Sequence, residues 1–253
     1  MCEKARIIRL MSSDLPKIHA ALAHAGYASR RKVEVLISEG RVKVNGAVAQ
    51  IGQRIDPSKD KVEVDGEHIP LHQEVRLLFL VDKPIGIVST TEDELGRQTV
   101  VEYLLAQIQK TEPKKAAELA KHRLYPVGRL DLESEGLLLL TNDGALTHQY
   151  THPSFESMKT YHVTINDKPT QRALAHLERG VMLREGYTAP ATVEVITSNS
   201  TQTILAITIH EGRNQQIRRM MRRVGYDVVK LVRVMMGPHH LDELDGKPYK
   251  DIS

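Results

Sequence analysis

The stretch that decides the fold is Gly128-Arg129-Leu130-Asp131-Leu132-Glu133-Ser134-Glu135-Gly136, which continues into four leucines at 137–140 and then Thr141-Asn142-Asp143-Gly144. A charged pair, Arg129 and Asp131, thus stands just before an apolar run that ends in turn-forming residues. A short apolar run with such ends is typical of a buried strand. We expect the leucines to form a strand, with Asp131 just before it, where a rigid element holds a reactive carboxylate in place.

An isolated Arg-x-Asp segment is more often a loop ion pair than a reactive site, but three further segments change this interpretation. Lys83-Pro84-Ile85-Gly86 follows the apolar residues 77–81, and Lys159-Thr160-Tyr161 opens an alternating strand. The third is the segment at 211–220, Glu-Gly-Arg-Asn-Gln-Gln-Ile-Arg-Arg-Met, which is followed by Lys230-Leu231-Val232-Arg233. In order and spacing, these segments resemble the motifs of ribosomal RNA pseudouridine synthases. The resemblance is to the subfamily with a small N-terminal domain like that of ribosomal protein S4, and it spans about residues 17–240.

Length and composition fit a soluble globular protein. A chain of 253 residues with 41% apolar residues forms one large domain or two smaller ones. The formal net charge is only +3, yet basic residues outnumber acidic ones by four in residues 17–64 and by six in residues 213–233. Because charge concentrated in patches attracts phosphate backbones, these two regions are candidate RNA-binding surfaces.

A single cysteine, Cys2, excludes an internal disulfide and a multi-cysteine zinc site, and it indicates a reducing compartment. No apolar stretch approaches the roughly 20 residues that span a bilayer. Residues 1–16 lack the apolar segment of a signal peptide. We therefore expect a cytoplasmic protein that acts as a monomer without membrane contact.

The first part of the chain has the signals of a small helical and hairpin module. After a polar leader over residues 1–15, Ser13-Asp14-Leu15-Pro16 begins a helix, and Ser29 caps a second helix that ends at Gly40. Alternating valines then lead into Asn45-Gly46 and Asp65-Gly66, both of which favour hairpin turns. We expect an S4-like RNA-binding domain over residues 16–64 and a linker over residues 65–75.

The remainder, residues 76–253, is expected to be the catalytic domain. Its β-rich runs are residues 77–81, 136–141, 161–165, 191–196 and 204–209, and its helical stretches are near residues 100–109, 170–179 and 215–224. This pattern predicts an α+β domain built on a mixed or antiparallel sheet with flanking helices. Residues 109–122 are interpreted as a solvated helix or loop insertion.

The chain lacks the usual sequence support for cofactor or metal chemistry. It contains neither a Gly-x-x-x-x-Gly-Lys phosphate loop nor a Gly-x-Gly-x-x-Gly fingerprint. His148 and His152 have the i, i+4 spacing of zinc ligands, and His239-His240 is a second candidate, but no third ligand completes either pair. We expect no metal site and no cofactor, and interpret these histidines as surface residues.

The resemblance implies that the protein isomerises a uridine of ribosomal RNA to pseudouridine, a reaction that needs no redox cofactor. It assigns Asp131 as the catalytic carboxylate, Arg218 as the cation that pairs with it, and Tyr161 as the ring that stacks on the target base. It also places Leu231 over the face of the uracil, and Arg129 in the stack that the flipped uridine vacates. Without the resemblance, Arg218 would be part of a solvated basic face, and Tyr161 and Leu231 would be ordinary packing residues.

Two sets of basic residues are the expected RNA contacts. Arg30, Arg31 and Lys32 start the second predicted helix, where backbone N–H groups and positive charge together favour phosphate. The second set surrounds the predicted catalytic cleft and comprises Arg213, Arg219, Arg222 and Arg223. An ordinary solvated helix face would interleave acidic residues with these arginines.

Two other functions stay open. A non-enzymatic, ribosome-associated RNA-binding protein could keep the fold, but it would not need Asp131, Tyr161 and Arg218 together. Within the enzyme class, the sequence of residues 126–131, 152–154 and 211–214 is most similar to that of the branch acting on the large ribosomal subunit. The branch acting on the small subunit shares the same motifs. Neither the target uridine nor the choice between free RNA and an assembling particle follows from the sequence.

Overall fold

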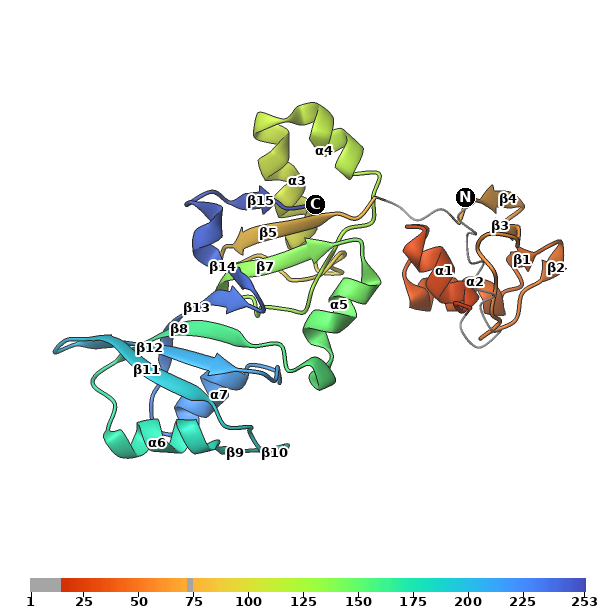
Figure 1. Ribbon diagram of the computed structural model, residues 1–253. Coiled ribbons are helices and arrows are strands. Elements are labelled where there is room, and N and C mark those ends of the chain that lie inside the picture. Colours follow the sequence, from red (N-terminus) through yellow and green to blue (C-terminus); the bar gives the residue numbers. More distant parts are fainter. Residues whose placement is uncertain (1–14, 72–74) are drawn as a thin grey trace, which may run out of the picture. The chain divides into compact units, whose positions relative to one another are not determined.

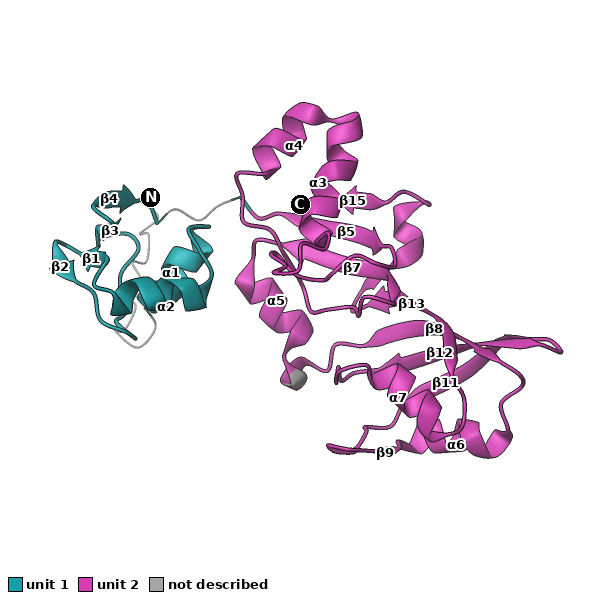
Figure 2. Ribbon diagram, turned by 180° about the vertical axis from the view of Figure 1, so that it is seen from behind, with its two compact units in different colours: residues 1–75 teal, residues 76–253 magenta. Residues whose placement is uncertain are grey.

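The computed structural model describes residues 15–71 and 75–253 (Figure 1). The chain divides into two compact units, residues 1–75 and residues 76–253 (Figure 2). Nearly all of the expected leader lies outside the described residues, as do Ser13 and Asp14 of the predicted first helix start. No helix in the described ranges is both long enough and apolar enough to cross a bilayer.

The N-terminal unit packs two helices on a four-stranded antiparallel sheet with the order β2-β1-β3-β4. Its elements are α1 Ile18–His24, α2 Arg30–Ser38, β1 Val42–Val44, β2 Ala47–Val48, β3 Val62–Val64 and β4 Glu67–Ile69. The predicted cap of α2 is confirmed, because the Ser29 side chain accepts a hydrogen bond of 3.2 Å from the backbone N–H of Lys32. The apolar stripe of α2 faces the core of this unit through Val33, Leu36 and Ile37.

Both predicted hairpins of this unit form. Asn45 and Gly46 have φ values of 52° and 83°, and Asp65 and Gly66 have 53° and 85°. Two successive left-handed residues are what a type I′ turn requires. The second turn leads directly into β4, whose Ile69 pairs with Val62 and packs against the core. The first part of the expected linker, residues 65–75, is therefore a strand.

The C-terminal unit combines a large sheet with helices on both faces. Its helices are α3 Val100–Thr111, α4 Pro113–Leu119, α5 Gly144–Thr151, η1 Pro153–Phe155, α6 Gln171–Arg179, α7 Gln216–Arg223 and η2 Leu241–Leu244. Its strands are β5 Leu78–Lys83, β6 Tyr125–Pro126, β7 Glu135–Thr141, β8 Lys159–Asn166, β9 Met182–Leu183, β10 Gly186–Tyr187, β11 Thr192–Ser198, β12 Gln202–Ile209, β13 Val228–Met236, β14 His239–His240 and β15 Tyr249–Asp251.

The described strands of this unit, apart from the β9–β10 hairpin, form a nine-stranded sheet with the main order β11-β12-β8-β13-β7-β5-β15. Strands β7 and β13 run parallel, whereas the other neighbouring pairs in the described sheet are antiparallel. Figure 1 shows β7 and β13 in the middle of the sheet, with α3 and α4 toward β15 and with α6 and α7 beside β11 and β12. The predicted α+β class with a mixed sheet is confirmed.

The leucine run forms the central strand β7 and contributes to two cores. Leu137, Leu138, Leu139 and Leu140 are all fully buried. Leu138 and Leu140 belong to the large core under α3, α6 and α7, while Leu137 and Leu139 belong to the smaller core under α5 and η2. Because successive strand residues point to opposite faces, a strand covered on both faces is apolar at every position.

Some elements are not indicated by the sequence pattern. Strand β13 carries Lys230 and Arg233 among its apolar residues, so it lacks the run that identifies a buried strand. Helix α5 has no apolar stripe and is held mainly by its cap Asp143 and by the buried Tyr150. Residues 109–122 are helical in large part, as expected, but α4 packs into the core through Ala116 and Leu119 and is more than a solvated insertion.

Two backbones approach each other closely in the centre of the sheet, at Gly136. This residue has φ +99° and pairs with Arg233 across the parallel β7–β13 ladder. A Cβ at Gly136 would lie 2.8 Å from the amide nitrogen of Arg233 and 2.9 Å from Cγ1 of Val232, with the Arg233 carbonyl oxygen closer still. Only glycine therefore lets β13 lie this close to β7.

Replacement of Gly136 by alanine is expected to destabilise the C-terminal unit through both backbone strain and steric collision. Gly186→Ala is the matched control, because Gly186 has φ +106° but a Cβ added there would meet nothing within 4 Å. The control should lose about 1–3 kcal/mol of unfolding free energy from strain. Gly136→Ala should lose about 1–3 kcal/mol more, because the backbones must move apart. Urea unfolding measures both losses, and equal losses would show that the close approach carries no energetic cost.

Candidate active site

A cleft of about 340 Å³ opens on the C-terminal unit where the 128–131 loop, β8, β13 and the loop before α7 meet. The residues most relevant to chemistry that line it are Arg129, Asp131, Lys159, Tyr161, Leu231 and Arg233. The fold thus brings Asp131, Tyr161, Arg129 and Leu231, which the sequence singled out from four separate positions, to one cavity. Arg218, the fifth such residue, is not part of the lining.

The loop that carries Asp131 is held through its backbone on several sides. The Ser89 hydroxyl donates to the carbonyl oxygen of Leu130 at 2.8 Å and accepts from the Leu130 N–H at 3.1 Å. The N–H of Gly86 donates to the carbonyl of Leu132 at 2.9 Å, and the Ser134 N–H closes a turn onto the carbonyl of Asp131 at 3.0 Å. Asp131 itself is half-buried, so its position is fixed while its carboxylate faces the cleft.

These contacts explain why the Lys83-Pro84-Ile85-Gly86 segment occurs together with the Asp131 segment. The buried ammonium of Lys83 donates to the carbonyls of Pro84 and Ile87, each at 2.9 Å, and so closes its own loop. Gly86, with φ +86°, then presents its N–H to the Asp131 loop. Ser89 was not singled out by the sequence, because a lone serine after an apolar residue gives no signal of a partner 41 residues away.

Arg218 holds the Asp131 loop through a backbone carbonyl but does not pair with the Asp131 carboxylate. Its Nη2 donates to the carbonyl of Glu133 at 2.9 Å and its Nη1 to the carbonyl of Val228 at 3.2 Å. Its Nε is buried and makes no hydrogen bond in the described structure. The described residues contain no ion pair between Arg218 and Asp131, so the expected pairing is absent and Arg218 instead ties α7 to the turn after Asp131.

One row of residues runs across four strands, and two of its members, Tyr161 and Arg233, line the cleft. The register pairs Lys83 on β5 with Gly136 on β7, Gly136 with Arg233 on β13, and Arg233 with Tyr161 on β8. Directly paired residues project from the same face of a sheet. Two cations and one aromatic ring therefore share this face, and Gly136 stands between Lys83 and Arg233 without a side chain.

Arg233 is the least expected member of this row. Its side chain is only 1% exposed, although it lines the cleft. The Nε donates to the carbonyl of Leu137 at 2.7 Å, while Nη2 is buried and has no hydrogen-bond partner within the described residues. A buried guanidinium with an unused donor is costly unless a ligand or a neighbouring carboxylate satisfies it. In the sequence, Arg233 stands out only as the last residue of a motif.

Lys83 and Lys159 experience the same enclosed environment. Burial lowers the pKa of Lys83 to about 8, while the negative charge of Asp131 opposes this shift. Burial also lowers the pKa of Lys159 to about 8, and the positive charge of Arg233 adds to the effect. Lys159 donates to the carbonyl of Ser157 at 2.7 Å. In the part of the chain that the structure describes, neither lysine forms an ion pair with an acidic side chain, and nor does Arg233.

Tyr161 and Leu231 give the cleft an apolar floor. They are 9% and 4% exposed, and both belong to the large core while lining the cavity. Leu231 precedes Arg233 by two residues on β13, so both side chains project from the same face beside Tyr161. Arg129 is exposed at the rim. A flat ring can thus lie against apolar side chains with cations at its edge.

The basic residues that were predicted to contact RNA differ in their surroundings. Arg213 is engaged by the protein, since it pairs with Glu211 at 3.0 Å and donates to the carbonyls of Gly186 and Tyr187. Arg219 pairs with Glu185, and Arg222 lies 3.6 Å from Asp227. A shallow hollow collects four arginines, of which Arg184 was missed by the sequence: Arg184, Arg219, Arg222 and Arg223.

In the N-terminal unit, Arg30, Arg31 and Lys32 are exposed in the first turn of α2. That turn contains no acidic residue. Their positive charges and the helix N-terminus therefore form an open basic surface in the place the sequence indicated.

Comparison with known proteins finds a family model for each of the two units. A family model described as RNA pseudouridylate synthase matches residues 77–223, and a model described as S4 domain matches residues 17–62. The chain is similar to the ribosomal large subunit pseudouridine synthase B of Bacillus subtilis (strain 168), with 41% identity over 222 residues that cover 87% of this chain and 84% of that protein.

Two further relatives extend the similarity over nearly the whole chain. An uncharacterized RNA pseudouridine synthase of Aquifex aeolicus (strain VF5) is 34% identical over 238 residues, which cover 94% of this chain and 90% of that protein. A solved crystal structure of pseudouridylate synthase superposes with a TM-score of 0.62 at 28% identity, covering 94% of this chain and 96% of that chain.

The lowered pKa of Lys83 predicts a stability difference that grows with pH. Between about pH 8 and the ordinary lysine pKa of 10.5, the unfolded chain holds a proton on Lys83 that the folded chain has lost. The free energy of unfolding therefore rises with pH in this range. Below pH 8 the folded protein bears the whole cost of burying the charged ammonium. Relative to Lys83→Met, the wild-type protein should gain on the order of 2 kcal/mol between pH 7.5 and 9.5.

Urea unfolding at several pH values measures this gain, and Lys168→Met, which removes an exposed lysine, is the control with no expected pH-dependent difference. A constant difference between wild type and Lys83→Met over the range would mean that Lys83 is not desolvated in the folded protein.

Proposed function

The chain belongs to the RNA pseudouridylate synthase family, and on that premise we propose that it converts one specific uridine of large-subunit ribosomal RNA to pseudouridine. The observation that carries the proposal is the cleft in which Asp131, Tyr161 and Leu231 meet above buried cations. The choice of the large subunit is supported by the 41% identity to a protein named for that substrate. The S4 domain adds an RNA-binding module to the synthase domain.

The reaction breaks the bond between the ribose C1′ and ring N1, turns the base, and joins C1′ to ring C5. The C5 proton leaves and N1 takes up a proton, so atoms and electrons balance without a redox partner. A fixed carboxylate assists either by attacking covalently or by stabilising positive charge on the sugar. Asp131 is the proposed carboxylate, because its loop is fixed on several sides while its side chain faces the cleft.

The apolar floor suits a flipped uracil. Tyr161 can stack on the ring and lies where it can take part in removal of the C5 proton, while Leu231 keeps water from the other atoms. Arg129, exposed at the rim, is the proposed residue that fills the gap left in the RNA stack. Exclusion of water strengthens each charge interaction within the cleft.

The cations have separate proposed roles. Arg218 acts as a positioning residue, because its bond to the Glu133 carbonyl holds the turn after Asp131. Arg233 and Lys83, which flank Gly136 in the row of paired residues, supply positive potential under the cleft and favour the ionised form of a nearby carboxylate. This division replaces the single Arg218–Asp131 pair expected from the sequence.

RNA affinity is assigned to two basic surfaces. Arg30, Arg31 and Lys32 are proposed to bind phosphates in the N-terminal unit. In the C-terminal unit, the hollow of Arg184, Arg219, Arg222 and Arg223 is the proposed track for the backbone. Arg213 lines the cleft, but its donors are already used by the protein, so its proposed contribution to phosphate binding is small.

Replacement of Asp131 by asparagine should abolish isomerisation while RNA affinity stays within a few-fold of wild type, because the amide keeps the shape but loses the charge. Single-turnover assays on a ribosomal RNA fragment, with pseudouridine mapped by sequencing, measure the isomerisation rate, and direct binding of the same fragment measures the affinity. Asp167→Asn is the matched control, since Asp167 is exposed outside the cleft. More than a few per cent of the wild-type rate in Asp131→Asn would exclude this assignment. Mapping both ribosomal RNAs from cells that lack the protein distinguishes the large from the small subunit.

A further inference from the structure

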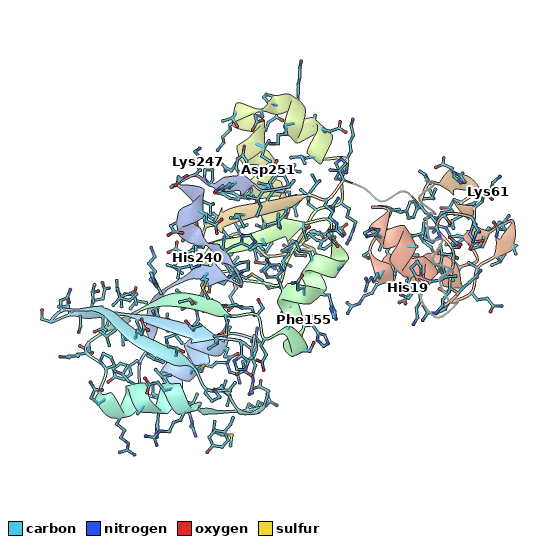
Figure 3. All side chains as sticks on the ribbon, viewed as in Figure 1. His19, Lys61, Phe155, His240, Lys247 and Asp251 are labelled. Atoms are coloured by element: carbon cyan, nitrogen blue, oxygen red, sulfur yellow. The ribbon has the colours of Figure 1, made fainter. Side chains whose placement is uncertain are left out.

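Three aromatic rings gather at the end of helix α5. The rings of His148 and His152 stack with their centroids 4.5 Å apart and an interplanar angle of 30°. The ring of Phe155 meets both edgewise, with centroids 5.6 Å from that of His148 and 6.4 Å from that of His152. Figure 3 shows Phe155 just beyond the end of α5. The sequence-based interpretation of His148 and His152 as surface residues did not account for this cluster.

This cluster leaves a phenylalanine ring exposed. Aromatic residues make up only 4% of the sequence, and it contains just two phenylalanines. Phe79 is fully buried, whereas Phe155 is 53% exposed, and both histidines are exposed as well. Leaving a phenylalanine ring in water forgoes the stabilisation that burial provides, so an exposed ring cluster indicates a surface that contacts something else.

The cluster adjoins the proposed active site. Thr151, on the same helix between the two histidines, lines the cleft. A Cβ at Gly128 would lie 3.6 Å from Cγ2 of Thr151, so the end of α5 packs beside the start of the Asp131 loop. Lys159, four residues after Phe155, also lines the cleft. The cluster therefore lies beside the cleft, where a nucleotide next to one held in the cleft can reach it.

Helix α5, which carries His148 and is followed by its C-cap His152, is firmly held. The Tyr150 ring is only 9% exposed, and it packs so closely on Gly237 that a Cβ there would lie 2.6 Å from Cε1 of Tyr150. At the other end of α5, Asp143 accepts hydrogen bonds from two backbone N–H groups and pairs with Arg76 at 3.1 Å. The two histidine rings are thus presented on a rigid support, against which the Phe155 ring packs edgewise, and this lowers the entropy lost on binding.

The charges closest to the rings in the sequence favour a base over a phosphate. Residues 143–158 contain no lysine or arginine, and Glu156 beside Phe155 is exposed. A carboxylate repels the phosphate backbone, whereas the face of a nucleobase is neutral. Aromatic side chains stack on unpaired bases of any sequence.

We propose that His148, His152 and Phe155 form a stacking site for an unpaired base of the substrate RNA, close in sequence to the target uridine. This inference rests on the proposed function, because it takes the cleft to hold a flipped nucleotide. It adds a second contact that fixes the register of the RNA strand, so that one particular uridine reaches Asp131.

The direct test compares RNA binding by the full-length wild-type protein and by Phe155→Ala on a ribosomal RNA fragment that the wild type converts. Loss of one stacked base is expected to raise Kd roughly five- to hundredfold. Phe155→Tyr should restore affinity, since a second ring keeps the stacking face. Val195→Ala, which shortens a 48% exposed side chain on β11, is the control and should bind like wild type. Thermal unfolding by circular dichroism establishes that each variant is folded.

Single abasic substitutions on both sides of the target uridine identify the partner base. At one position, removal of the base should weaken wild-type binding and leave Phe155→Ala unaffected, so that the two proteins bind that RNA equally. If Phe155→Ala binds intact RNA within twofold of wild type, or if no abasic position closes the gap, the stacking site is excluded and a protein partner becomes the explanation for the exposed rings. Because conversion by the wild type is measured on the same RNA, failure of the proposed function is seen separately.

Discussion

The parallel contact between β7 and β13 at Gly136 is the constraint on which the site depends. Without a side chain at this position, the backbone of Arg233 can lie against the strand that follows the Asp131 loop. The same register places Lys83 and Tyr161 in one row with Arg233. A wider separation would move the floor of the cleft away from the loop above it, so a single glycine couples the packing of the core to the geometry of the site.

The site also depends on contacts between segments far apart in the chain. Gly86 and Ser89, from the segment after β5, and Arg218, from α7, reach the backbone of the Asp131 loop, so the loop takes its position only when these distant segments have folded together. In return, the buried Lys83 and Arg233 form no ion pair with an acidic side chain among the described residues, and Arg233 keeps an unused donor. Such an arrangement lowers stability and favours ligands that carry acceptors or negative charge. An RNA nucleotide has both.

Local sequence patterns predicted much of the fold. The cap at Ser29, the hairpin turns at Asn45-Gly46 and Asp65-Gly66, and the leucine strand all follow from short-range rules. The meeting of Asp131, Tyr161 and Leu231 came from the family resemblance. Strand β13 was missed because its charged residues break the apolar pattern, and the cleft beside them is created only by the register. The actual partners of Arg218 and the unused donor of Arg233 are likewise long-range results, which no window of sequence contains.

The most direct measurement of the central claim is the single-turnover isomerisation rate of Gly136→Ala, at a temperature where circular dichroism shows the variant to be folded, with Gly186→Ala measured alongside. If the close approach at Gly136 builds the floor of the cleft, the rate should fall at least about tenfold, equivalent to roughly 1.4 kcal/mol of activation free energy. RNA affinity should stay near that of wild type, and Gly186→Ala should react normally. A folded Gly136→Ala variant with the full wild-type rate would contradict the claim.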